Sequence, residues 1–355
     1  MIGIRADANE EIATGHIMRC ITIAKQLMKA GERVCFFVAD EFAVPMLNWA
    51  GMDYVCLQTN WSEMEEELPI LRYELKKAGC EKLLVDSYRA TKGYFEELKK
   101  ICKVVYIDDM FEDVYPVHMI INYNAYYERF PYKQAYGQDT KLLLGTAYVP
   151  LREEFFNDGG VYLKKEDVAE AETSAKEDTN GCHVLLSCGG GDAYNALSGI
   201  LAEAVTRDGL KYIIFDTVVG RFHNNEGELK MLAGRYEQIV LHHNVGNMAE
   251  LMGKCKAAVS AAGTVLFELC AMHVPTVFFV CADNQKYDSD FFAREERMLF
   301  AGDIRTDREV CIKEICTRLE RLVRDKKLQT EMKQKLCEVT DGNGAERIAE
   351  EIIRL

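Results

Sequence analysis

A histidine near the amino terminus stands where a predicted helix begins. His16 follows Thr14 and Gly15, and a helical pattern covers 17–30. The run at 2–8 has the apolar character of a buried strand, so these residues form a strand-to-helix turn whose small side chains let a ligand approach the backbone. A helix N-terminus disfavours the imidazolium form, so His16 stays neutral and able to accept a proton. The sequence favours a general base here, and a Gly-His pair that only caps the helix is the alternative.

Polar side chains also follow two later predicted strands of the first half. Asp86 and Tyr88 come at the end of one strand, and Asp109 ends the next. Parallel strands end at the same edge of a sheet, so we expect these side chains to lie at the same crevice as His16. They could orient a sugar, although an aspartate at a strand end commonly caps a turn or a helix.

The second half contains a glycine-rich turn. Ser-Cys-Gly-Gly-Gly-Asp occupies 187–192, between a predicted strand and a predicted helix, and includes Gly189 and Gly190. Consecutive glycines free the backbone to wrap a phosphate or to let another domain approach closely. The pattern is neither a dinucleotide fingerprint nor a Walker loop, so neither of those functions is favoured.

A later turn of the same kind is the most informative segment. Ser-Ala-Ala-Gly-Thr leads from a strand into a helix at Thr264, and Glu268 lies four residues further on. Residues i and i+4 share a helix face, so Thr264 and the helix amides could hold phosphate while Glu268 reaches a ribose hydroxyl. A carboxylate that merely complements the helix dipole is the alternative. Asn284 and Gln285 end the next strand and could donate to a sugar or phosphate, or form a surface turn.

Short apolar runs that alternate with helical patterns predict the sheet framework. Strands that are apolar throughout and separated by helices indicate parallel sheets covered on both faces. The runs lie at 2–8, 34–39, 54–57, 82–87, 104–109, 119–123 and 141–144, and again at 183–188, 212–219, 239–243, 257–261 and 276–281. The last fifty residues are predicted to be packing helices with solvated faces.

We predict an α/β fold with two Rossmann-like domains facing across a cleft. Residues 1–150 form the first domain, and 151–181 form a linker or mobile acidic insertion, since this segment is too polar to build a core. Residues 182–340 form the second domain, and 341–355 form a C-terminal helix.

Composition narrows the class of protein. The chain has 355 residues, 48% of them hydrophobic, which is enough for two cores, and its net charge of −14 argues against a nucleic-acid binder. The 13 cysteines include no Cys-x-x-Cys pair and predict reduced thiols, with neither a disulfide framework nor a metal site. No signal peptide or long apolar run is present, so we expect a cytoplasmic protein without a membrane span.

Ordered motifs along nearly the whole chain resemble the UDP-sugar hydrolases of pseudaminic acid biosynthesis, which are related to the MurG-like branch of GT-B glycosyltransferases. The motifs lie at 5–8, 14–20, 85–88, 107–109, 143–145, 187–192, 247–252, 262–268, 282–285 and 342–347. This family usually has His where Ser87 stands and a proline-containing loop where this chain has 192–195. These departures bear on the particular sugar.

The resemblance implies a GT-B-like fold and hydrolysis of UDP-2,4-diacetamido-2,4,6-trideoxy-β-L-altropyranose, or a close UDP-sugar, to free sugar and UDP. It implies that His16 is the general base, that Tyr88 and Asn284 bind the sugar and that Glu268 holds the ribose. Further substrate contacts are expected from Arg5, Asp7, Thr14, Gly15, Asp109 and Gln285. UDP contacts are expected from Gly189, Gly190, Val245, Met248, Ala262, Gly263 and Thr264.

The implied reaction is a single attack of water on the anomeric carbon, with inversion. UDP leaves as a stable anion, so one base suffices, and the scheme needs no metal or other cofactor. Arg5 or Arg19 could help to stabilise the departing charge. A glycosyltransferase with the same fold and a non-catalytic UDP-sugar-binding partner are the alternatives. The charged C-terminal helices could also support association with other sugar-biosynthesis enzymes, although a solvated face is the simpler interpretation.

Overall fold

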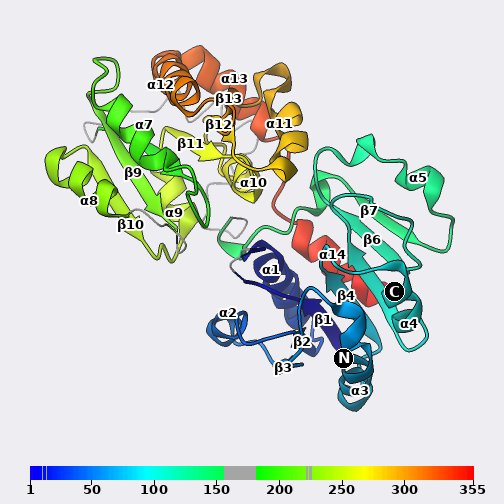
Figure 1. Ribbon diagram of the computed structural model, residues 1–355. Helices are drawn as coiled ribbons and strands as arrows, with labels where there is room; N and C mark the ends of the chain where they lie inside the picture. The colour runs from blue at the N-terminus through cyan, green and yellow to red at the C-terminus, as the bar shows by residue number, and fades with distance from the viewer. Residues whose placement is uncertain (10, 13, 156–180, 221–222, 224–225) are drawn as a thin grey trace. The chain divides into compact units, whose positions relative to one another are not determined.

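The chain divides into two compact units in the computed structural model, which describes residues 1–9, 11–12, 14–155, 181–220, 223 and 226–355. The first unit comprises Met1–Arg152 together with Gly342–Leu355, and the second comprises Glu153–Asp341 (Figure 1). The predicted linker at 151–181 lies mostly outside the described residues.

The first unit is an α/β domain around a parallel sheet with strand order β3-β2-β1-β4-β5-β6-β7. Its strands are β1 (Ile2–Ala6), β2 (Val34–Val38), β3 (Tyr54–Cys56), β4 (Lys82–Asp86), β5 (Lys103–Ile107), β6 (Met119–Asn122) and β7 (Lys141–Leu144). Its helices are α1 (Gly15–Lys29), α2 (Val44–Ala50), α3 (Met64–Ala78), α4 (Lys92–Lys99), α5 (Tyr132–Ala135) and α14 (Gly344–Arg354), with short 3₁₀ turns at Tyr127–Arg129 and Thr146–Tyr148.

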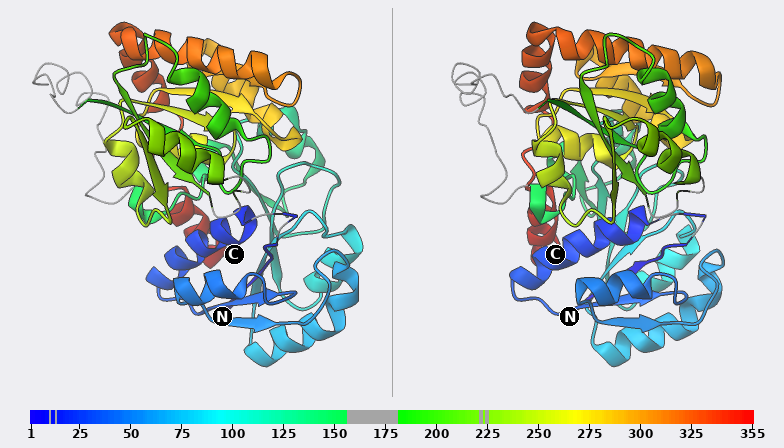
Figure 2. Two further views of the ribbon diagram at one scale, coloured as in Figure 1. Left: turned by 60° about the vertical axis from the view of Figure 1, so that its left-hand side comes forward. Right: turned by 90° about the vertical axis from the view of Figure 1, so that its left-hand side faces the viewer.

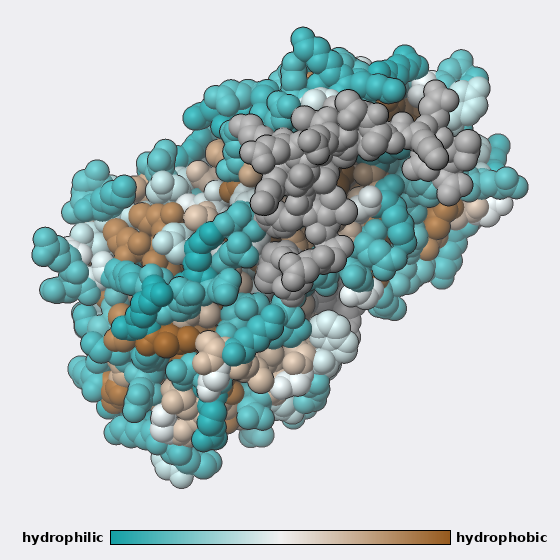
Figure 3. All heavy atoms as spheres, turned by 180° about the vertical axis from the view of Figure 1, so that it is seen from behind, coloured by the Kyte–Doolittle hydropathy of each residue, from teal (hydrophilic) through white to brown (hydrophobic). Residues whose placement is uncertain are grey.

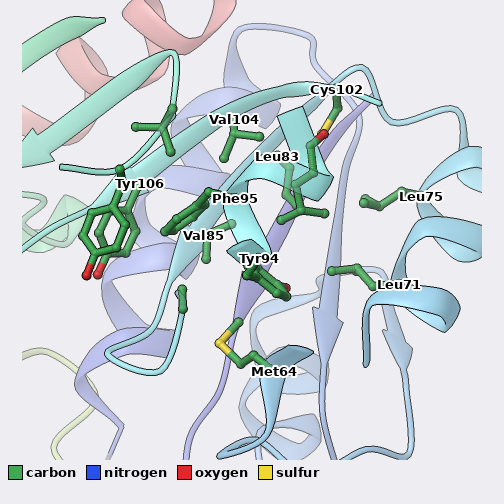
Figure 4. Close-up of a cluster of buried hydrophobic side chains, with 14 of the residues drawn as sticks. Met64, Leu71, Leu75, Leu83, Val85, Tyr94, Phe95, Cys102, Val104 and Tyr106 are labelled. Carbon is green, nitrogen blue, oxygen red and sulfur yellow. The ribbon is translucent and has the colours of Figure 1, made fainter. Parts of the chain in front are cut away.

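Alternation along the strands separates two faces of this sheet. Leu83 and Val85 of β4 point into a hydrophobic core with α3 and α4 (Figure 4). Side chains of a strand alternate between faces, so Asp86 lies on the opposite face, where it contacts α1. Helix α14 packs along α1, so the C-terminal helix belongs to the first unit (Figure 1).

The second unit repeats the architecture with strand order β10-β9-β8-β11-β12-β13, and its strand pairs are parallel. Its strands are β8 (Cys182–Ser187), β9 (Ile213–Val219), β10 (Ile239–His243), β11 (Ala257–Ala261), β12 (Thr276–Val280) and β13 (Leu299–Asp303). Its helices are α7 (Ala196–Ala204), α8 (Glu226–Arg235), α9 (Met248–Gly253), α10 (Thr264–Ala271), α11 (Lys286–Ala293), α12 (Arg308–Arg324) and α13 (Lys326–Leu336), with 3₁₀ turns η3 (Glu153–Phe155), η4 (Asp283–Gln285) and η5 (Arg294–Glu296). Helix α12 packs beside α7 and over β11, β12 and β13 (Figure 2).

Every predicted strand has a counterpart in the structure, with ends that differ by up to two residues. One strand was not predicted. β13 pairs with β12 at the sheet edge, and it is short and ends in Gly302 and Asp303, so its sequence has no sustained apolar run.

The helices in the described part of the chain lack the combination of length and apolar character that a transmembrane segment has. Hydrophilic side chains cover most of the face drawn in Figure 3, and hydrophobic ones form separate patches.

Candidate active site

Both sheets have a topological switch point, where the strand order reverses direction. In the first sheet it lies between β1 and β4, and in the second between β8 and β11. Loops at the carboxyl ends of such neighbouring strands leave a crevice in which ligands bind in open α/β sheets. His16 follows β1 and Asp86 ends β4, so these two side chains flank the first switch point.

His16 and Asp86 form a buried pair. His16 is the second residue of α1, and its Nδ1 lies 2.6 Å from Oδ1 of Asp86; His16 is 6% exposed and Asp86 1%. A carboxylate accepts hydrogen bonds only, so Nδ1 carries the hydrogen, and in the neutral ring Nε2 then carries the lone pair. The pair therefore presents Nε2 as a proton acceptor, as in hydrolases where an aspartate orients a catalytic histidine.

Arg19, one helical turn after His16, joins two carboxylates. Its Nε and Nη2 donate to Asp86 at 2.6 and 2.5 Å, and its Nη1 donates to Asp109 at 2.9 Å. Burial alone raises the pKa of Asp86, but the Arg19 guanidinium and the His16 ring outweigh it and hold that pKa well below its usual range. Asp86 therefore remains ionised and keeps accepting the hydrogen bond from His16.

Tyr88 connects the histidine to the second carboxylate. Its ring meets the His16 ring edge-on with centroids 4.6 Å apart, and its hydroxyl donates to Oδ2 of Asp109 at 2.8 Å. Tyr88 is 42% exposed, whereas Asp109 is only 5% exposed, so the phenol extends from the surface to a buried partner. Burial of the hydroxyl and the charge of Asp109 raise the pKa of Tyr88 well above its usual range, which keeps the phenol protonated.

Two neighbours from the loop after β6 complete the network, and sequence reasoning missed both. Asn124 donates from Nδ2 to Oδ1 of Asp109 at 2.9 Å, and the Tyr123 hydroxyl accepts from Nη1 of Arg19 at 2.6 Å. Both residues follow the end of β6, so the strand-end signal that identified Asp109 also applies to them.

Asp108 is adjacent in sequence but is not part of this network. Its Oδ1 accepts the backbone amides of Met110 and Phe111 at 3.2 and 2.8 Å, and its buried Oδ2 has no hydrogen-bond partner. Burial raises the pKa of Asp108 to about 6.

Arg5 and Asp7 form a separate cluster. Arg5 is fully buried and donates to both oxygens of Glu67 on α3 at 2.7 Å and to Oδ2 of Asp7 at 2.5 Å. Oδ1 of Asp7 accepts the amide of Ala39 at 2.8 Å. Arg5 thus lies on the α3 face of the sheet, opposite to the face that carries Asp86. This geometry favours a supporting role for Arg5 and Asp7 over the direct substrate contact that the sequence suggested.

Thr14 and Gly15 form the start of α1. Thr14 occupies the N-cap position without a side-chain capping bond, and Gly15 is exposed with open space at the position of a side chain. The backbone next to His16 is therefore accessible, as expected from the small residues at this turn.

The predicted UDP-binding turns flank the switch point of the second sheet. The glycine loop follows β8, with Gly189 at φ +72° and its amide donating to Oγ of Ser187 at 3.2 Å. Gly263 is the N-cap of α10, and Thr264 begins that helix. Ala262 directly follows β11, and its amide donates to the carbonyl of Phe279 at 2.7 Å. Glu268 lies one turn into α10, four residues after Thr264.

Several other predicted contacts already have partners in the structure. The amide of Met248, at the start of α9, donates to Oε1 of Glu154 at 2.9 Å. The side-chain oxygen of Gln285 accepts a hydrogen bond from the amide of Cys281 at 2.8 Å, so this oxygen already has a partner within its own turn. Val245 lies in the loop before α9 and is half-buried, and the side chain of Asn284 in η4 lies outside the described part of the chain.

Among the described residues, no group of three or more His, Cys, Asp and Glu side chains is arranged to hold a metal ion. The cysteines in the described residues are free thiols.

No protein-family profile matches the chain. An uncharacterized protein of Methanocaldococcus jannaschii is 25% identical over 303 residues, which cover 83% of this chain but only 58% of that protein, so the chain spans little more than half of its length. The UDP-2,4-diacetamido-2,4,6-trideoxy-β-L-altropyranose hydrolase of Campylobacter jejuni is 22% identical over 305 residues, which cover 82% of this chain and 95% of that protein.

Solved structures of the GT-B class have the same fold. MurG of Acinetobacter baumannii matches with a TM-score of 0.68 at 12% identity and covers 100% of this chain and 99% of its own. The UDP-GlcNAc 2-epimerase of Neisseria meningitidis, bound to UDP-GlcNAc, matches with a TM-score of 0.65 at 13% identity over 100% of both chains. The prediction of a GT-B-like fold with two parallel-sheet α/β domains is confirmed.

Proposed function

We propose that this protein hydrolyses a UDP-sugar to free sugar and UDP, with His16 as the general base. The observation that carries the proposal is the His16–Asp86 pair at the first switch point, in which the carboxylate fixes Nδ1–H and leaves Nε2 as a proton acceptor. General-base catalysis by such a histidine accelerates a reaction by roughly 10²- to 10⁴-fold.

Water attacks the anomeric carbon as Nε2 of His16 takes its proton, and the bond to UDP breaks. The diphosphate leaves as a stable anion and needs electrostatic support rather than protonation. A single displacement inverts the configuration at the anomeric carbon. Tyr88 and Asp109, held together by a hydrogen bond, are proposed to orient the sugar.

UDP is proposed to bind to the second unit. The turns after β8 and β11 place backbone amides and a helix N-terminus at the second switch point, which suits an anionic diphosphate. The proposed contacts are Gly189, Gly190, Val245, Met248, Ala262, Gly263, Thr264 and Glu268. The hydrolase from C. jejuni and the UDP-GlcNAc-bound epimerase support a UDP-sugar as the ligand, and the former makes UDP-2,4-diacetamido-2,4,6-trideoxy-β-L-altropyranose the first substrate to test.

A glycosyltransferase is the second candidate, favoured by the match to MurG. In that case His16 would take the proton of an acceptor hydroxyl rather than that of water. The two reactions differ in whether UDP is released without an acceptor.

The test is to follow the purified protein and the UDP-sugar by proton NMR without any acceptor. A hydrolase releases UDP and first forms the free sugar with inverted anomeric configuration. UDP release that requires an added acceptor would contradict hydrolysis and support transfer.

A further inference from the structure

A second histidine lies at the carboxyl edge of the second sheet. His223 follows β9, and its amide donates to the carbonyl of Gly220 at 3.1 Å. Its side chain is only 2% exposed, and neither ring nitrogen has a hydrogen-bond partner. Buried polar groups in folded proteins are nearly always hydrogen-bonded, so a buried ring with two unpartnered nitrogens indicates that a ligand supplies the hydrogen-bond partner.

Gly220, whose carbonyl accepts the amide of His223, packs directly on the glycine loop. A Cβ atom added to Gly220 would lie 2.6 Å from the carbonyl oxygen of Gly190 and closer still to that of Gly189. Only glycine permits this approach of two backbones. His223 therefore belongs to the same corner of the second unit as the loop proposed to hold phosphate.

A carboxylate lies on one side of the ring. Oδ2 of Asp192 is 4.0 Å from Nδ1 of His223, which is too far for a hydrogen bond but close enough to attract an imidazolium. The carboxylate is fixed in place, because its two oxygens accept the amides of Ala196 and Leu197 at the start of α7 at 2.7 and 2.9 Å.

We propose that His223 is a phosphate-binding residue that donates a hydrogen bond to the diphosphate of the bound nucleotide. The inference rests on the proposed function, which it deepens by assigning a side-chain hydrogen-bond donor to the phosphate site. Asp192 lies on one side of the ring, and the amides of the glycine loop join the ring in contacting the anion. A hydrogen bond to a charged phosphate is stronger than one between neutral groups, so the ring gains a strong partner when the nucleotide binds.

The test compares the binding of UDP and uridine by calorimetry. His223→Phe keeps the ring shape but removes both nitrogens, and His223→Gln keeps a neutral donor. We expect His223→Phe to weaken UDP binding roughly tenfold or more, as for loss of a hydrogen bond to a charged group, and to leave uridine binding within about twofold. The affinity of His223→Gln for UDP should lie between those of the wild type and His223→Phe. The control is His243→Phe, the same change at a more exposed histidine at the end of β10, which should bind UDP as the wild type does.

Thermal unfolding of the free variants separates binding from folding. Removing two unpartnered buried nitrogens should leave the Tm of His223→Phe equal to or above that of the wild type. UDP binding that is unchanged in His223→Phe would overturn the inference while leaving the proposed function intact. Equal weakening of UDP and uridine would also overturn it, because the ring would then act on the fold of the site. Failure of the wild-type protein to bind UDP would overturn the proposed function and this inference together.

Discussion

Asp86 determines which nitrogen of His16 can act as a base. The carboxylate fixes the hydrogen on Nδ1, and Arg19 keeps the carboxylate ionised through two hydrogen bonds. An asparagine of the same shape could donate to Nδ1 from its amide group and so select the other tautomer, with the hydrogen on Nε2.

We therefore predict that Asp86→Asn lowers kcat by roughly 10²- to 10⁴-fold, the range known for loss of general-base function or of the orienting aspartate. The dissociation constant for UDP should stay unchanged, because the proposed UDP contacts lie in the second unit. Steady-state kinetics and calorimetry check both points. A variant with full kcat would refute the role of the pair.

Asp108 provides both a matched control and a separate prediction about pH. Its pKa is raised to about 6 by burial, above the ordinary value of about 3.9. The folded protein then binds the proton of Asp108 more tightly than the unfolded chain does, so protonation of Asp108 stabilises the folded state. This stabilisation is fully present below about pH 4 and is lost as the pH rises through 6. In the wild type, the free energy of unfolding should therefore fall by up to about 3 kcal/mol over this pH range because of Asp108, and Asp108→Asn should abolish that part of the fall. The kcat of Asp108→Asn should stay near the wild-type value.

Urea denaturation of both proteins between pH 4 and 8 measures the effect. Parallel stability curves for the wild type and Asp108→Asn over that interval would show that Asp108 titrates normally.

The sequence predicted individual site residues better than it predicted the contacts between them. His16, Tyr88 and Asp109 were predicted at a common edge and do form one network. The link through Arg19 was not predicted. Arg19 is separated from Asp86 by 67 positions and from Asp109 by 90, and such distant residues can be recognised as neighbours only once the strand order is known. Arg5 was assigned to the substrate, but alternation along β1 places it on the other face, against Glu67.

Helix α14 ties the end of the chain to the first unit. Its buried residues, including Ala345, Ile348 and Ile352, recur at helical spacing and form the apolar stripe that packs on α1. Its first residue, Gly344, approaches the backbone of the segment before the second unit: an added Cβ would lie 2.6 Å from the carbonyl carbon of Tyr148 and closer still to Val149.

Gly344→Ala should therefore destabilise the first unit by about 1–3 kcal/mol, because backbone must shift to relieve the overlap. Gly227→Ala is the control, since a Cβ at that helical glycine of the second unit meets no atom within 4 Å. Chemical denaturation compares the two variants. Equal stability of both would contradict the close packing at Gly344.

At the element level, the sequence predicted the strands because parallel strands buried on both faces need uninterrupted apolar runs. Strand β13 was not predicted because its five residues include Gly302 and end at Asp303, which interrupts the apolar run. The C-terminal helix was predicted from its periodicity, but its packing on α1 was not, since periodicity identifies an apolar face and not the surface that covers it.

The two units carry different parts of the proposed reaction. The first contains the proposed base, His16, and its partner Asp86, and the second contains the turns suited to a diphosphate. Two Rossmann-like domains could be predicted because strands and helices alternate in both halves of the chain, and the resemblance to a known family implied the GT-B-like fold. The substrate could not be predicted to the same depth, because the fold serves many reactions and the sugar contacts depend on individual side chains.

We predict that UDP alone protects the second unit from hydrogen exchange, most strongly at 187–192 and 261–268. A ligand at 100 times its dissociation constant stabilises the native state by about 2.7 kcal/mol, which is measurable as slower exchange. His16→Gln should give the same protection pattern. Protection centred on residues 14–20 instead would place UDP in the first unit and contradict the division of roles.

The most direct measurement of the central claim uses ¹⁸O-labelled water. The wild-type protein and His16→Gln are incubated with UDP-2,4-diacetamido-2,4,6-trideoxy-β-L-altropyranose without an acceptor, and both products are analysed by mass spectrometry at early times. We predict label in the free sugar, none in UDP, and a rate reduced by roughly 10²-fold or more in His16→Gln. Label in UDP would mean attack at phosphorus, and an equal rate in the variant would mean that His16 is not the base; either result would contradict the account.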